Sequence, residues 1–415
     1  MKISLFTPTH NPTYLPEAYK FLKDQDYDEW VIVLNNGASL EGLSSEFLAD
    51  ARNKFIIYPG TTTKIGALKK FACSQCEGDI LCELDHDDIL VTGAIDLIRN
   101  AFISNPEASL VYGNCAEFTN DADRTPRTYA LGNGWEYRDF YFDGVLYKEA
   151  VAPVPVPYHA SIILWQPNHP RAFRKTCYAA VGGYNENLGV LDDSDLMCRL
   201  YLQGNFIHID KCLYLYRVTG DNTWLQRNKE IQDKMQPMQE ANLWPLTVSW
   251  AKRNNLLMLD LGGRFERIEG ALSVDLKDAD IVCNLNDRWP FEESSIGVIR
   301  AFDIIEHLIN PIHVMSEMHR VLIPGGYAFI EVPSTDGRGA FQDPLHVSFW
   351  NSNSFWYYTR KEQAKFIDNT SIRFKDITLK TYFPSSWHEE HNISYVKAHL
   401  LCLKDGYRPK GQILI

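Results

Sequence analysis

The sequence predicts an α/β protein with two consecutive sheets, each covered by helices. Short apolar runs that have the pattern of buried strands alternate with segments of helical composition, a rhythm typical of mainly parallel sheets. Each run ends in polar, turn-forming residues, and the rhythm begins a second time near residue 256. The chain has 415 residues, of which 45% are hydrophobic and 13% aromatic, so two or three domains can each bury a core.

Charge and composition narrow the class of protein. A formal net charge of −12 argues against a general nucleic-acid or anionic-membrane surface. No apolar stretch approaches the roughly 20 residues that span a bilayer, and the first residues become polar too early for a signal peptide. Nine cysteines at irregular spacing fit a reducing compartment. We therefore expect a cytoplasmic protein with no nucleic-acid partner and no transmembrane segment.

The first two predicted strands end in polar turns. The strand at residues 3–6 runs into Thr7-Pro8-Thr9, and the strand at residues 30–34 runs into Asn35-Asn36-Gly37. A segment of helical composition separates them, and residues 55–58 supply a third strand. In parallel sheets of this kind, ligands bind beyond the carboxyl ends of the strands. Both polar turns are therefore candidate ligand contacts.

The stretch DILCELDHDDIL, at residues 79–90, carries the most informative pattern. An apolar run predicts a buried strand, after which Asp85 and Asp87 follow at spacing i, i+2. Carboxylates at that spacing on extended chain point to the same side, where they can share one hard cation that clamps a diphosphate. The alternative is that Asp87 and Asp88 cap a helix beginning near residue 89. Three polar strand ends meeting at one edge favour the metal site.

Three further charged segments have two interpretations each. Lys69 and Lys70 lie on a predicted helix, either facing a diphosphate or facing solvent. The cluster Asp192-Asp193-Ser194-Asp195 precedes a segment of helical periodicity, so it can be a catalytic cluster or an acidic N-cap favoured by the helix dipole. The segment NHPRAFRK at residues 168–175 can meet an anionic acceptor, but a solvated charge run is the safer expectation.

Five segments then occur in order: SLFTPTHNP, VIVLNNGAS, GDILCELDHDDIL, VGGYNENLGVLDDSDLMCRLYLQG and LYRVTGDNTW. Through them residues 1–225 resemble the GT-A glycosyltransferases of the large inverting family that builds bacterial polysaccharides. Such a transfer needs a base for the acceptor hydroxyl and a cation for the departing diphosphate. The resemblance implies Asp193 as the base and Mn²⁺ or Mg²⁺ held by Asp85 and Asp87. It implies that the donor nucleotide-sugar contacts Thr7, Pro8, Thr9, Asn35, Lys69, Asp85 and Asp87.

Two positions depart from the family pattern. Relatives often carry Asp where this chain has Asn35, a position that reads the base, so the resemblance does not imply which nucleotide the donor carries. Relatives also often carry a His near Thr219, and its absence leaves the third protein ligand of the metal open.

A polar, helical connector is predicted for residues 226–253, after which the strand and helix rhythm resumes. The next strands are expected at residues 256–261, 271–274, 296–301 and 327–332. Their carboxyl ends carry Asp260 with Gly262 and Gly263, then Asp275, and then Asp303. An acidic residue that ends the second strand is well placed to bind a ribose.

A second ordered set is LMLDLGG, SVDL, RWPFEESSIGVIRAFDIIEHL, MHRVLIPGGYAFIEVPS and QDPLHVSFW. Through it residues 254–403 resemble class I S-adenosylmethionine-dependent methyltransferases, with late strands at residues 373–382 and 395–403 as the closing antiparallel pair. The resemblance implies that S-adenosylmethionine contacts Asp260, Gly262, Gly263, Asp275, Asn284 and Asp303. Its implied methyl-acceptor site contains Glu306, His307 and His346, with a capping or packed histidine as the alternative for His307.

The crossover after Gly263 is unusually short. Residues 263–271 are too few for a normal crossover helix, since such a unit needs about 10 to 12 residues or more. The usual glycine loop and helix N-terminus therefore cannot both be present. S-adenosylmethionine is a cation at sulfur and does not need the anion-binding helix end that a pyrophosphate uses.

The sequence thus predicts an N-terminal GT-A nucleotide-diphospho-sugar transferase fold at residues 1–225, a connector at 226–253, and a Rossmann-like class I methyltransferase fold at 254–415. The expected function is bifunctional: metal-dependent, inverting sugar transfer from a nucleotide-sugar to a glycan acceptor, with methylation by S-adenosylmethionine. One alternative is a glycosyltransferase with a degenerate, scaffolding second half, and another is a non-catalytic glycan-binding protein. A nicotinamide enzyme is not expected, because no Gly-x-Gly-x-x-Gly occurs.

Overall fold

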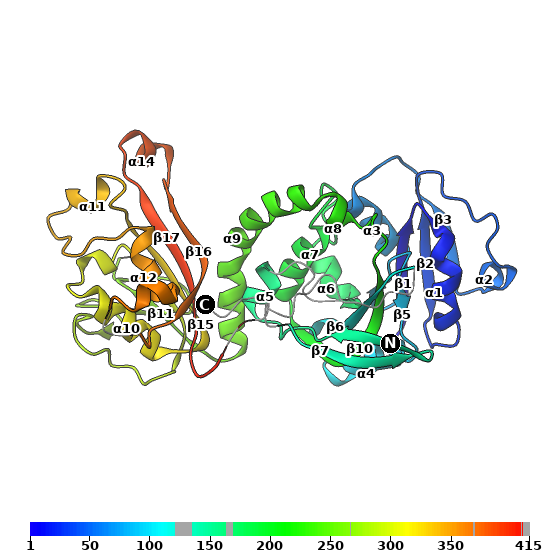
Figure 1. Ribbon diagram of the computed structural model, residues 1–415, viewed down its shortest axis with the longest axis horizontal. Helices are drawn as coiled ribbons and strands as arrows, with labels where there is room; N and C mark the ends of the chain where they lie inside the picture. Colours follow the sequence, from blue (N-terminus) through cyan, green and yellow to red (C-terminus); the bar gives the residue numbers. More distant parts are fainter. Residues whose placement is uncertain (121–134, 163–168, 266, 368–369, 408, 410–415) are drawn as a thin grey trace. The chain divides into compact units, whose positions relative to one another are not determined.

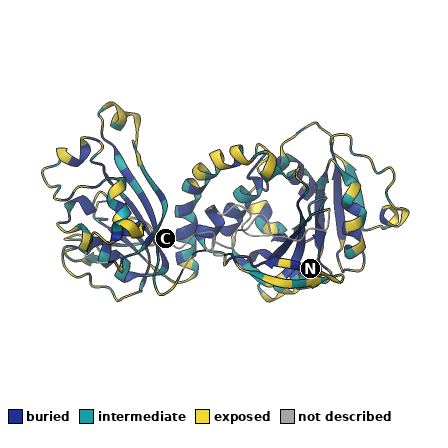
Figure 2. Cartoon of the chain, in the orientation of Figure 1, coloured by how far each residue is buried: buried dark blue, intermediate teal, exposed yellow. Residues whose placement is uncertain are grey.

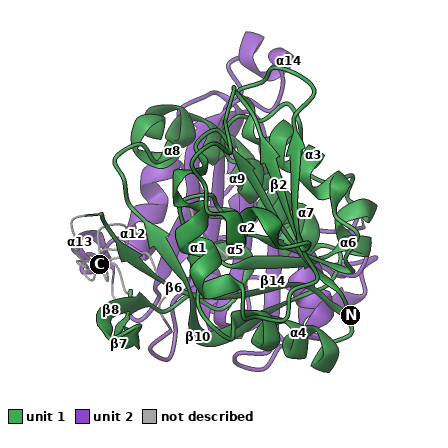
Figure 3. Cartoon of the chain, turned by 90° about the vertical axis from the view of Figure 1, so that its right-hand side faces the viewer, with its two compact units in different colours: residues 1–246, 410–413 green, residues 247–409, 414–415 purple. Residues whose placement is uncertain are grey.

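The structure is a computed structural model that describes residues 1–120, 135–162, 169–265, 267–367, 370–407 and 409. The described chain divides into two compact units, residues 1–246 (unit 1) and residues 247–409 (unit 2), coloured separately in Figure 3. Each unit has its own sheet and its own hydrophobic core.

Unit 1 is built on a mixed sheet in which the order β3-β2-β1-β4-β9-β6-β10-β5 runs from edge to edge, and the hairpin β7-β8 pairs beside β6 (Figure 1). The strands β3, β2, β1 and β4 are parallel, whereas β9 is antiparallel to both of its neighbours. The strands are β1 Ile3–Thr9, β2 Glu29–Leu34, β3 Asn53–Ile57, β4 Ile80–Glu83, β5 Ile89–Leu90, β6 Ala108–Phe118, β7 Tyr137–Phe142, β8 Val145–Ala150, β9 Arg171–Arg174 and β10 Asn205–Arg217.

Helices pack against this sheet through apolar faces. In α1, Leu15, Ala18, Tyr19 and Leu22 are buried at the spacing that places them on one side of a helix. The helices of unit 1 are α1 Leu15–Leu22, α2 Ser45–Ala49, α3 Ile65–Gln75, α4 Ala94–Ser104, α5 Pro157–Ile162, α6 Lys175–Ala180, α7 Asp192–Tyr201 and α8 Thr223–Gln226, with the 3-10 turn η1 at Pro12–Tyr14. Helix α9, Asn228–Arg253, continues from unit 1 into unit 2.

Most residues of the central strands are buried (Figure 2). Every residue of β2, β4 and β6 is buried, which explains their nearly continuous apolar sequences. The exposed residues lie on the outer faces of the covering helices, in the loops and on the hairpin β7-β8. A charged residue inside one of these strands therefore needs a partner, and this requirement matters for Glu83 below.

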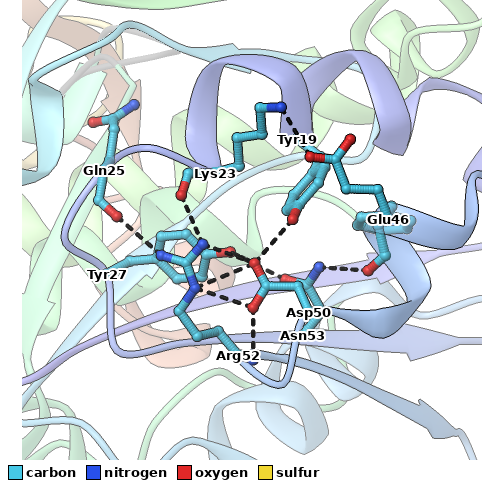
Figure 4. A network of polar contacts seen from close by, with 9 residues as sticks. Tyr19, Lys23, Gln25, Tyr27, Glu46, Asp50, Arg52 and Asn53 are labelled. Atoms are coloured by element: carbon cyan, nitrogen blue, oxygen red, sulfur yellow. Dashed lines mark hydrogen bonds and ion pairs between the residues drawn. The ribbon is translucent and has the colours of Figure 1, made fainter.

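A polar network joins two loops at the edge of unit 1 (Figure 4). Arg52 forms an ion pair with Asp50 at 2.7 Å and donates hydrogen bonds to the carbonyl oxygens of Lys23, at 2.7 Å, and Gln25, at 3.1 Å. The hydroxyl of Tyr19 donates to Asp50 at 2.9 Å. The guanidinium therefore ties the loop before β2 to the loop before β3, far from the carboxyl ends of the strands.

Unit 2 contains a seven-stranded sheet in the order β13-β12-β11-β14-β15-β17-β16. The strands from β13 to β15 are parallel, and β17 is antiparallel to both β15 and β16, so the predicted closing antiparallel pair is confirmed. The strands are β11 Leu257–Leu261, β12 Leu272–Asp275, β13 Ile281–Val282, β14 Ile296–Phe302, β15 Leu322–Pro333, β16 Phe374–Tyr382 and β17 Tyr395–Cys402.

The helical elements of unit 2 are short, apart from one. They are η3 Ile305–His307, α10 Pro311–Val321, α11 Gly339–Gln342, η4 Ser352–Phe355, α12 Trp356–Thr359, α13 Lys361–Ala364 and α14 Ser386–Glu390. The described residues between β11 and β12 contain no helix, which confirms the short crossover. Gly262, with φ at +75°, turns the chain there, and its N–H donates to the carbonyl oxygen of Val274 at 2.8 Å.

We expect unit 2 to lose stability in mild acid through His399, a buried residue of β17. Burial, together with the charges of Lys397 and Lys380, lowers its pKa to about 3. Below pH about 6.5 His399 binds a proton in the unfolded chain but not in the folded chain. The free energy of unfolding therefore falls as the pH falls from about 6.5 toward 3. The loss between pH 7 and pH 5 should be on the order of 2 kcal/mol.

The variant His399→Phe tests this expectation, because Nδ1 of His399 has no hydrogen-bond partner among the described residues and the substitution breaks none. Urea unfolding at pH 7 and pH 5, followed by pulsed hydrogen exchange in β15 to β17, should show a larger pH-dependent loss in the wild type than in the variant. Equal losses in both chains would contradict it.

The two sheets and their helices confirm the α/β architecture and its repetition along the chain. Among the described helices, none combines the length and the apolar character that a membrane crossing requires.

Candidate active sites

One cavity of unit 1, of about 360 Å³, lies where the carboxyl ends of β1, β2 and β4 meet the start of α7. Its lining combines acidic, basic and aromatic side chains from segments that are far apart in the sequence. Of the predicted site residues, it brings together Pro8, Asn35, Lys69, Asp85, Asp87 and Asp193. Residues that complete the polar lining include His10, Asn11, Tyr14, His86, His169, Arg171, Asp192, Ser194, Tyr216, Thr219, Asp221 and Asn222.

The turn at residues 85–88 is fixed to β10 by its backbone and by Asp88. The hydroxyl of Tyr214 accepts the N–H of Asp85 at 3.0 Å, and Nε of Arg217 donates to the carbonyl oxygen of Asp87 at 2.7 Å. Asp88 is buried and accepts the N–H of Arg217 at 2.6 Å. Residues Ile89–Leu90 form β5 rather than a helix, so the capping interpretation of Asp87 and Asp88 is wrong. The turn instead presents Asp85 and Asp87 to the cavity.

Two buried cations pair with the carboxylates of the cavity wall. Lys69, on α3, forms ion pairs with Glu83 and, at 3.4 Å, with Asp192. Arg171, on β9, forms ion pairs with Glu83 at 3.3 Å and with Asp193 at 2.9 Å. Glu83 therefore anchors both cations, and each cation holds one member of the Asp192-Asp193 pair.

The two neighbouring aspartates differ in their electrostatics. Burial raises the pKa of Asp192 to about 6, with Lys69 opposing the shift. Burial also disfavours the charged form of Asp193, but Arg171 and Lys69 outweigh it and hold the pKa of Asp193 below its usual value. The N-cap of α7 is Leu191 and not an aspartate, so the capping interpretation of Asp192 and Asp193 is wrong.

The solvated charge run predicted for residues 168–175 is wrong for His169 and Arg171, because both side chains are buried. His169 is 7% exposed and Arg171 is 2% exposed, and both line the cavity. Nε2 of His169 lies 3.7 Å from an oxygen of Asp85 and 3.9 Å from an oxygen of Glu83. It has no hydrogen-bond partner among the described residues. Burial lowers the pKa of His169 well below its usual value, so the imidazole is neutral.

The remaining predicted donor contacts lie under the cavity wall. Thr7 is fully buried, donates to the carbonyl oxygen of Leu84 at 2.5 Å and accepts from the indole of Trp30 at 2.8 Å. The hydroxyl of Thr9 accepts the N–H of Asn11 at 3.0 Å. Neither threonine is among the lining residues. Their hydrogen bonds position the loop that carries Pro8.

In unit 2 the residues predicted for S-adenosylmethionine lie at the ends of neighbouring strands. Asp260 is the last residue but one of β11, is 1% exposed, and forms an ion pair with Arg300 at 2.8 Å. A Cβ atom added at Gly263 would lie 2.5 Å from an oxygen of Asp260, so only glycine fits there. Asp275 ends the adjacent strand β12 and is partly exposed. Asn284 and Asp303 are exposed, in the loops after β13 and β14.

The predicted methyl-acceptor residues come together beside the end of β14. Glu306 and His307 lie in η3, and His346 lies in the loop after α11. The rings of His307 and His346 are 5.0 Å apart, between centroids, and Nε2 of His346 is 4.0 Å from an oxygen of Glu306. Burial raises the pKa of Glu306 to about 8. The backbone N–H groups of Val347 and Ser348 both donate to the carbonyl oxygen of Glu306, which holds the loop in place.

Two parts of the chain match models of known protein families. Residues 4–163 match the family model described as "Glycosyl transferase family 2", and residues 227–377 match the model described as "Methyltransferase domain". These matches confirm the predicted GT-A-like and methyltransferase folds.

Similar curated proteins match a little over half of the chain. A chondroitin synthase of Pasteurella multocida strain Pm70 is 23% identical over 237 residues, which are 56% of this chain and 22% of that protein. A hyaluronan synthase of Pasteurella multocida is 22% identical over 230 residues, which are 54% of this chain and 21% of that protein. The chain thus spans less than a quarter of the length of either relative.

Solved structures show a distant likeness. TarS residues 1–349 of S. aureus align with a TM-score of 0.41 and 14% identity, over 65% of this chain and 76% of that chain. The same protein in complex with UDP-GlcNAc gives a TM-score of 0.39 and 17% identity, over 52% of this chain and 59% of that chain. Residues 4–163 are thus similar to glycosyl transferase family 2, and residues 227–377 are similar to methyltransferase domains.

Proposed function

We propose that unit 1 transfers a sugar from a nucleotide-sugar donor to a hydroxyl group of an acceptor, with inversion at the anomeric carbon. The observation that carries this proposal is the convergence of Asp85, Asp87 and Asp193 on one cavity of about 360 Å³. A cavity of this size is typical of small-molecule sites. The glycosyl transferase family 2 match of residues 4–163 supports the reaction class.

Asp193 is proposed as the general base. Its side chain is 29% exposed, whereas the side chain of Asp192 is 6% exposed, so an acceptor hydroxyl can reach Asp193 more easily. Arg171 holds the carboxylate in place at 2.9 Å and keeps it ionised, ready to accept the hydroxyl proton. As that proton moves to Asp193, the hydroxyl oxygen attacks the anomeric carbon and the nucleoside diphosphate departs.

A divalent cation, Mn²⁺ or Mg²⁺, fits the carboxylates of the cavity. Asp85 and Asp87 both line the cavity, and His169 adds a neutral nitrogen without a hydrogen-bond partner among the described residues. We propose Asp85, Asp87 and His169 as the metal ligands. His169 would be the third protein ligand, in place of the histidine that relatives often carry near Thr219. An imidazole ligand favours Mn²⁺ over Mg²⁺. When bound, the cation would stabilise the negative charge of the departing diphosphate.

The donor is proposed to lie along the loops that follow β1 and β2. Pro8 and Asn35 line the cavity there, and buried Thr7 and Thr9 fix the backbone of the first loop. Lys69 already shares its charge with Glu83 and Asp192. We therefore propose that Lys69 acts mainly by positioning these carboxylates, and adds positive potential for the diphosphate.

The test is nucleotide release from a panel of UDP-, GDP-, dTDP- and CMP-sugars in the presence of Mn²⁺, Mg²⁺ or EDTA. We expect one donor to be hydrolysed or transferred in a metal-dependent manner, and Asp87→Asn to abolish the metal-dependent part. Asp96→Asn is a matched control, because Asp96 is exposed on α4 and lies outside the cavity. Release that is unchanged by EDTA or by Asp87→Asn would contradict the proposal.

Unit 2 is proposed to bind S-adenosylmethionine at the ends of β11, β12 and β14. Asp260, Gly262 and Gly263 would line the methionine side, and Asp275 would accept hydrogen bonds from the ribose. Asn284 and Asp303 would contact the remaining edge of the cofactor. The methyltransferase-domain match of residues 227–377 supports the assignment.

A second candidate for unit 2 is a scaffold that binds no cofactor. The crossover without a helix among its described residues favours it, since the usual helix N-terminus is missing there. Calorimetry of the full-length chain with S-adenosylmethionine distinguishes the two candidates. Saturable heat that Asp275→Ala abolishes supports the cofactor site, and no heat at high concentration supports the scaffold.

The acceptor is proposed to be a glycan that both units modify, with residues 1–225 and 254–415 as the catalytic domains and 226–253 as the connector. The names of the matched relatives, synthases of chondroitin and hyaluronan, support a glycan. Joining both sites in one chain would raise the effective concentration of the product of unit 1 at unit 2. Product that the intact chain never methylates in the presence of S-adenosylmethionine would contradict this coupling.

A further inference from the structure

A cluster in unit 2 has the composition of a metal site. Glu306, His307 and His346 each offer one ligand atom, and these atoms lie within 4.8 Å of one another. Glu306 is 2% exposed. Asp343 adds a second carboxylate, with an oxygen 3.9 Å from Nε2 of His346. The cluster follows the carboxyl end of β14.

The hydrogen bonds of both histidines leave the same nitrogen available. Nδ1 of His307 lies 3.1 Å from the carbonyl oxygen of Leu345, and Nδ1 of His346 lies 2.9 Å from the carbonyl oxygen of Ala340. A carbonyl oxygen only accepts, so each Nδ1 carries a proton, and the lone pair that a metal would use is the one at Nε2. A backbone carbonyl on the second nitrogen is the usual support of a histidine that binds a metal.

The carboxylates face this lone pair without a direct hydrogen bond. Nε2 of His346 is 4.0 Å from Glu306 and 3.9 Å from Asp343, distances too long for a hydrogen bond. Oε2 of Glu306 has no hydrogen-bond partner among the described residues, although it is inaccessible to water. A buried polar oxygen without a partner is costly, and a cation between Glu306 and the two imidazoles would give the carboxyl group of Glu306 a partner.

The surrounding backbone holds the ligands together before any ion binds. The N–H groups of Val347 and Ser348 donate to the carbonyl oxygen of Glu306 at 2.9 and 3.0 Å. The hydroxyl of Ser348 donates to the carbonyl oxygen of Ile305 at 3.0 Å and accepts from the indole of Trp350, also at 3.0 Å. The loop that carries His346 is thereby tied to the segment that carries Glu306 and His307.

We propose that Glu306, His307 and His346 bind a divalent transition-metal ion, with Asp343 as a fourth ligand or as the neighbour of an open coordination position. An ion that lies between two ligand atoms, with a bond of about 2.0 to 2.2 Å to each, would span the distances of up to 4.8 Å between these atoms after small side-chain movements. Two imidazoles with a carboxylate suit Zn²⁺, Mn²⁺ or Fe²⁺, whereas Mg²⁺ prefers oxygen ligands alone.

The position of the ion gives it a role that rests on the proposed methyl transfer. β14 pairs with β11, so the cluster lies one strand away from Asp260 and the glycine turn. A glycan hydroxyl bound to the ion would release its proton more readily. Its oxygen would form a bond to the methyl carbon as the bond from sulfur to that carbon breaks. The products are the methyl ether, S-adenosylhomocysteine and the proton, which passes to solvent.

Metal binding is measured on the full-length chain, freed of metal by chelation and titrated with Co²⁺ and Zn²⁺. We expect the double variant His307→Gln/His346→Gln to bind one equivalent less than the wild type and to lose part of the visible Co²⁺ spectrum. His391→Gln is the matched control, because Nδ1 of His391 also meets a carbonyl oxygen, that of Trp387, away from the cluster. It should bind as the wild type does.

Glu306→Gln keeps the shape of the side chain and guards against a variant that fails to fold. It should weaken the site by more than the about 10- to 100-fold typical of changes around a ligand. His169→Gln identifies the part of the Co²⁺ spectrum that comes from the proposed metal site of unit 1. This part should persist in the His307→Gln/His346→Gln chain. Equal stoichiometry and spectra in that chain and the wild type would overturn the proposal. Metal binding without methyl transfer would remove only the catalytic role of the ion.

Discussion

Asp193→Asn should lower the rate of sugar transfer by about 10²- to 10⁴-fold, the usual contribution of a general base. The amide retains the shape of the side chain and can still meet Arg171, which lies 2.9 Å from Asp193 in the wild type. It cannot accept the hydroxyl proton. Binding of the donor, measured by calorimetry with the nucleoside diphosphate, should remain close to that of the wild type, because the proposed partner of Asp193 is the acceptor hydroxyl.

Asp195→Asn is the matched control for this substitution. Asp195 lies on the same helix, accepts from Nε of Arg199 at 3.1 Å, and is not among the lining residues of the cavity. Its loss should leave the rate close to that of the wild type. A fall as large as that of Asp193→Asn would mean that disturbance of α7, and not loss of a base, explains the effect.

The pH dependence of kcat distinguishes the two neighbouring aspartates. A general base must be ionised, so activity falls as the pH drops through the pKa of the base. Arg171 and Lys69 keep the pKa of Asp193 below its usual value despite burial, so Asp193 should stay ionised and impose no acid limb above pH 5. Burial raises the pKa of Asp192 to about 6. An acid limb centred near pH 6 that Asp192→Asn removes would assign the base to Asp192 instead.

The strand ends of both units could be predicted from the sequence for a simple reason. Asp85, Asp260 and Asp275 each follow an apolar run, and the end of a parallel strand is where the chain leaves the core. Local sequence thus determined which polar residues reach the edge of the sheet. The choice between capping and catalysis at Asp87 and Asp193 needed tertiary contacts, because both roles place an acid before an apolar segment.

The sequence does not predict the burial of His169 and Arg171, because that burial depends on a long-range pairing. Strand β9 inserts between β4 and β6 and is antiparallel to both, so Arg171 lies opposite the carboxylates only in the folded sheet. No local pattern gives that order of strands. One signal was available: Glu83 ends an apolar run that predicts a buried strand, and a buried carboxylate requires cations from elsewhere in the chain.

Lys69→Met should destabilise unit 1 by about 3 to 5 kcal/mol, the usual cost of removing one partner from a buried ion pair. The side chain of Lys69 is 10% exposed and pairs with Glu83 and Asp192. Although burial lowers the pKa of Lys69, Asp192, Glu83 and Asp85 outweigh it, so the ammonium is charged in the folded chain. Without it, Arg171 alone would face the carboxylates of the wall.

Lys70→Met is the matched control, one residue further along α3. Lys70 pairs with Glu186 at 3.3 Å, and the two side chains are 42% and 62% exposed, so screening by water leaves the pair worth about 0 to 1 kcal/mol. Urea unfolding of both variants in EDTA, followed by hydrogen exchange in β1 and β4, measures the difference. The loss in Lys69→Met should shrink at pH 5, because Asp192, whose pKa burial raises to about 6, can then take up a proton. Equal, small losses in the two variants would show that the carboxylates of the cavity do not depend on Lys69 for their charge balance.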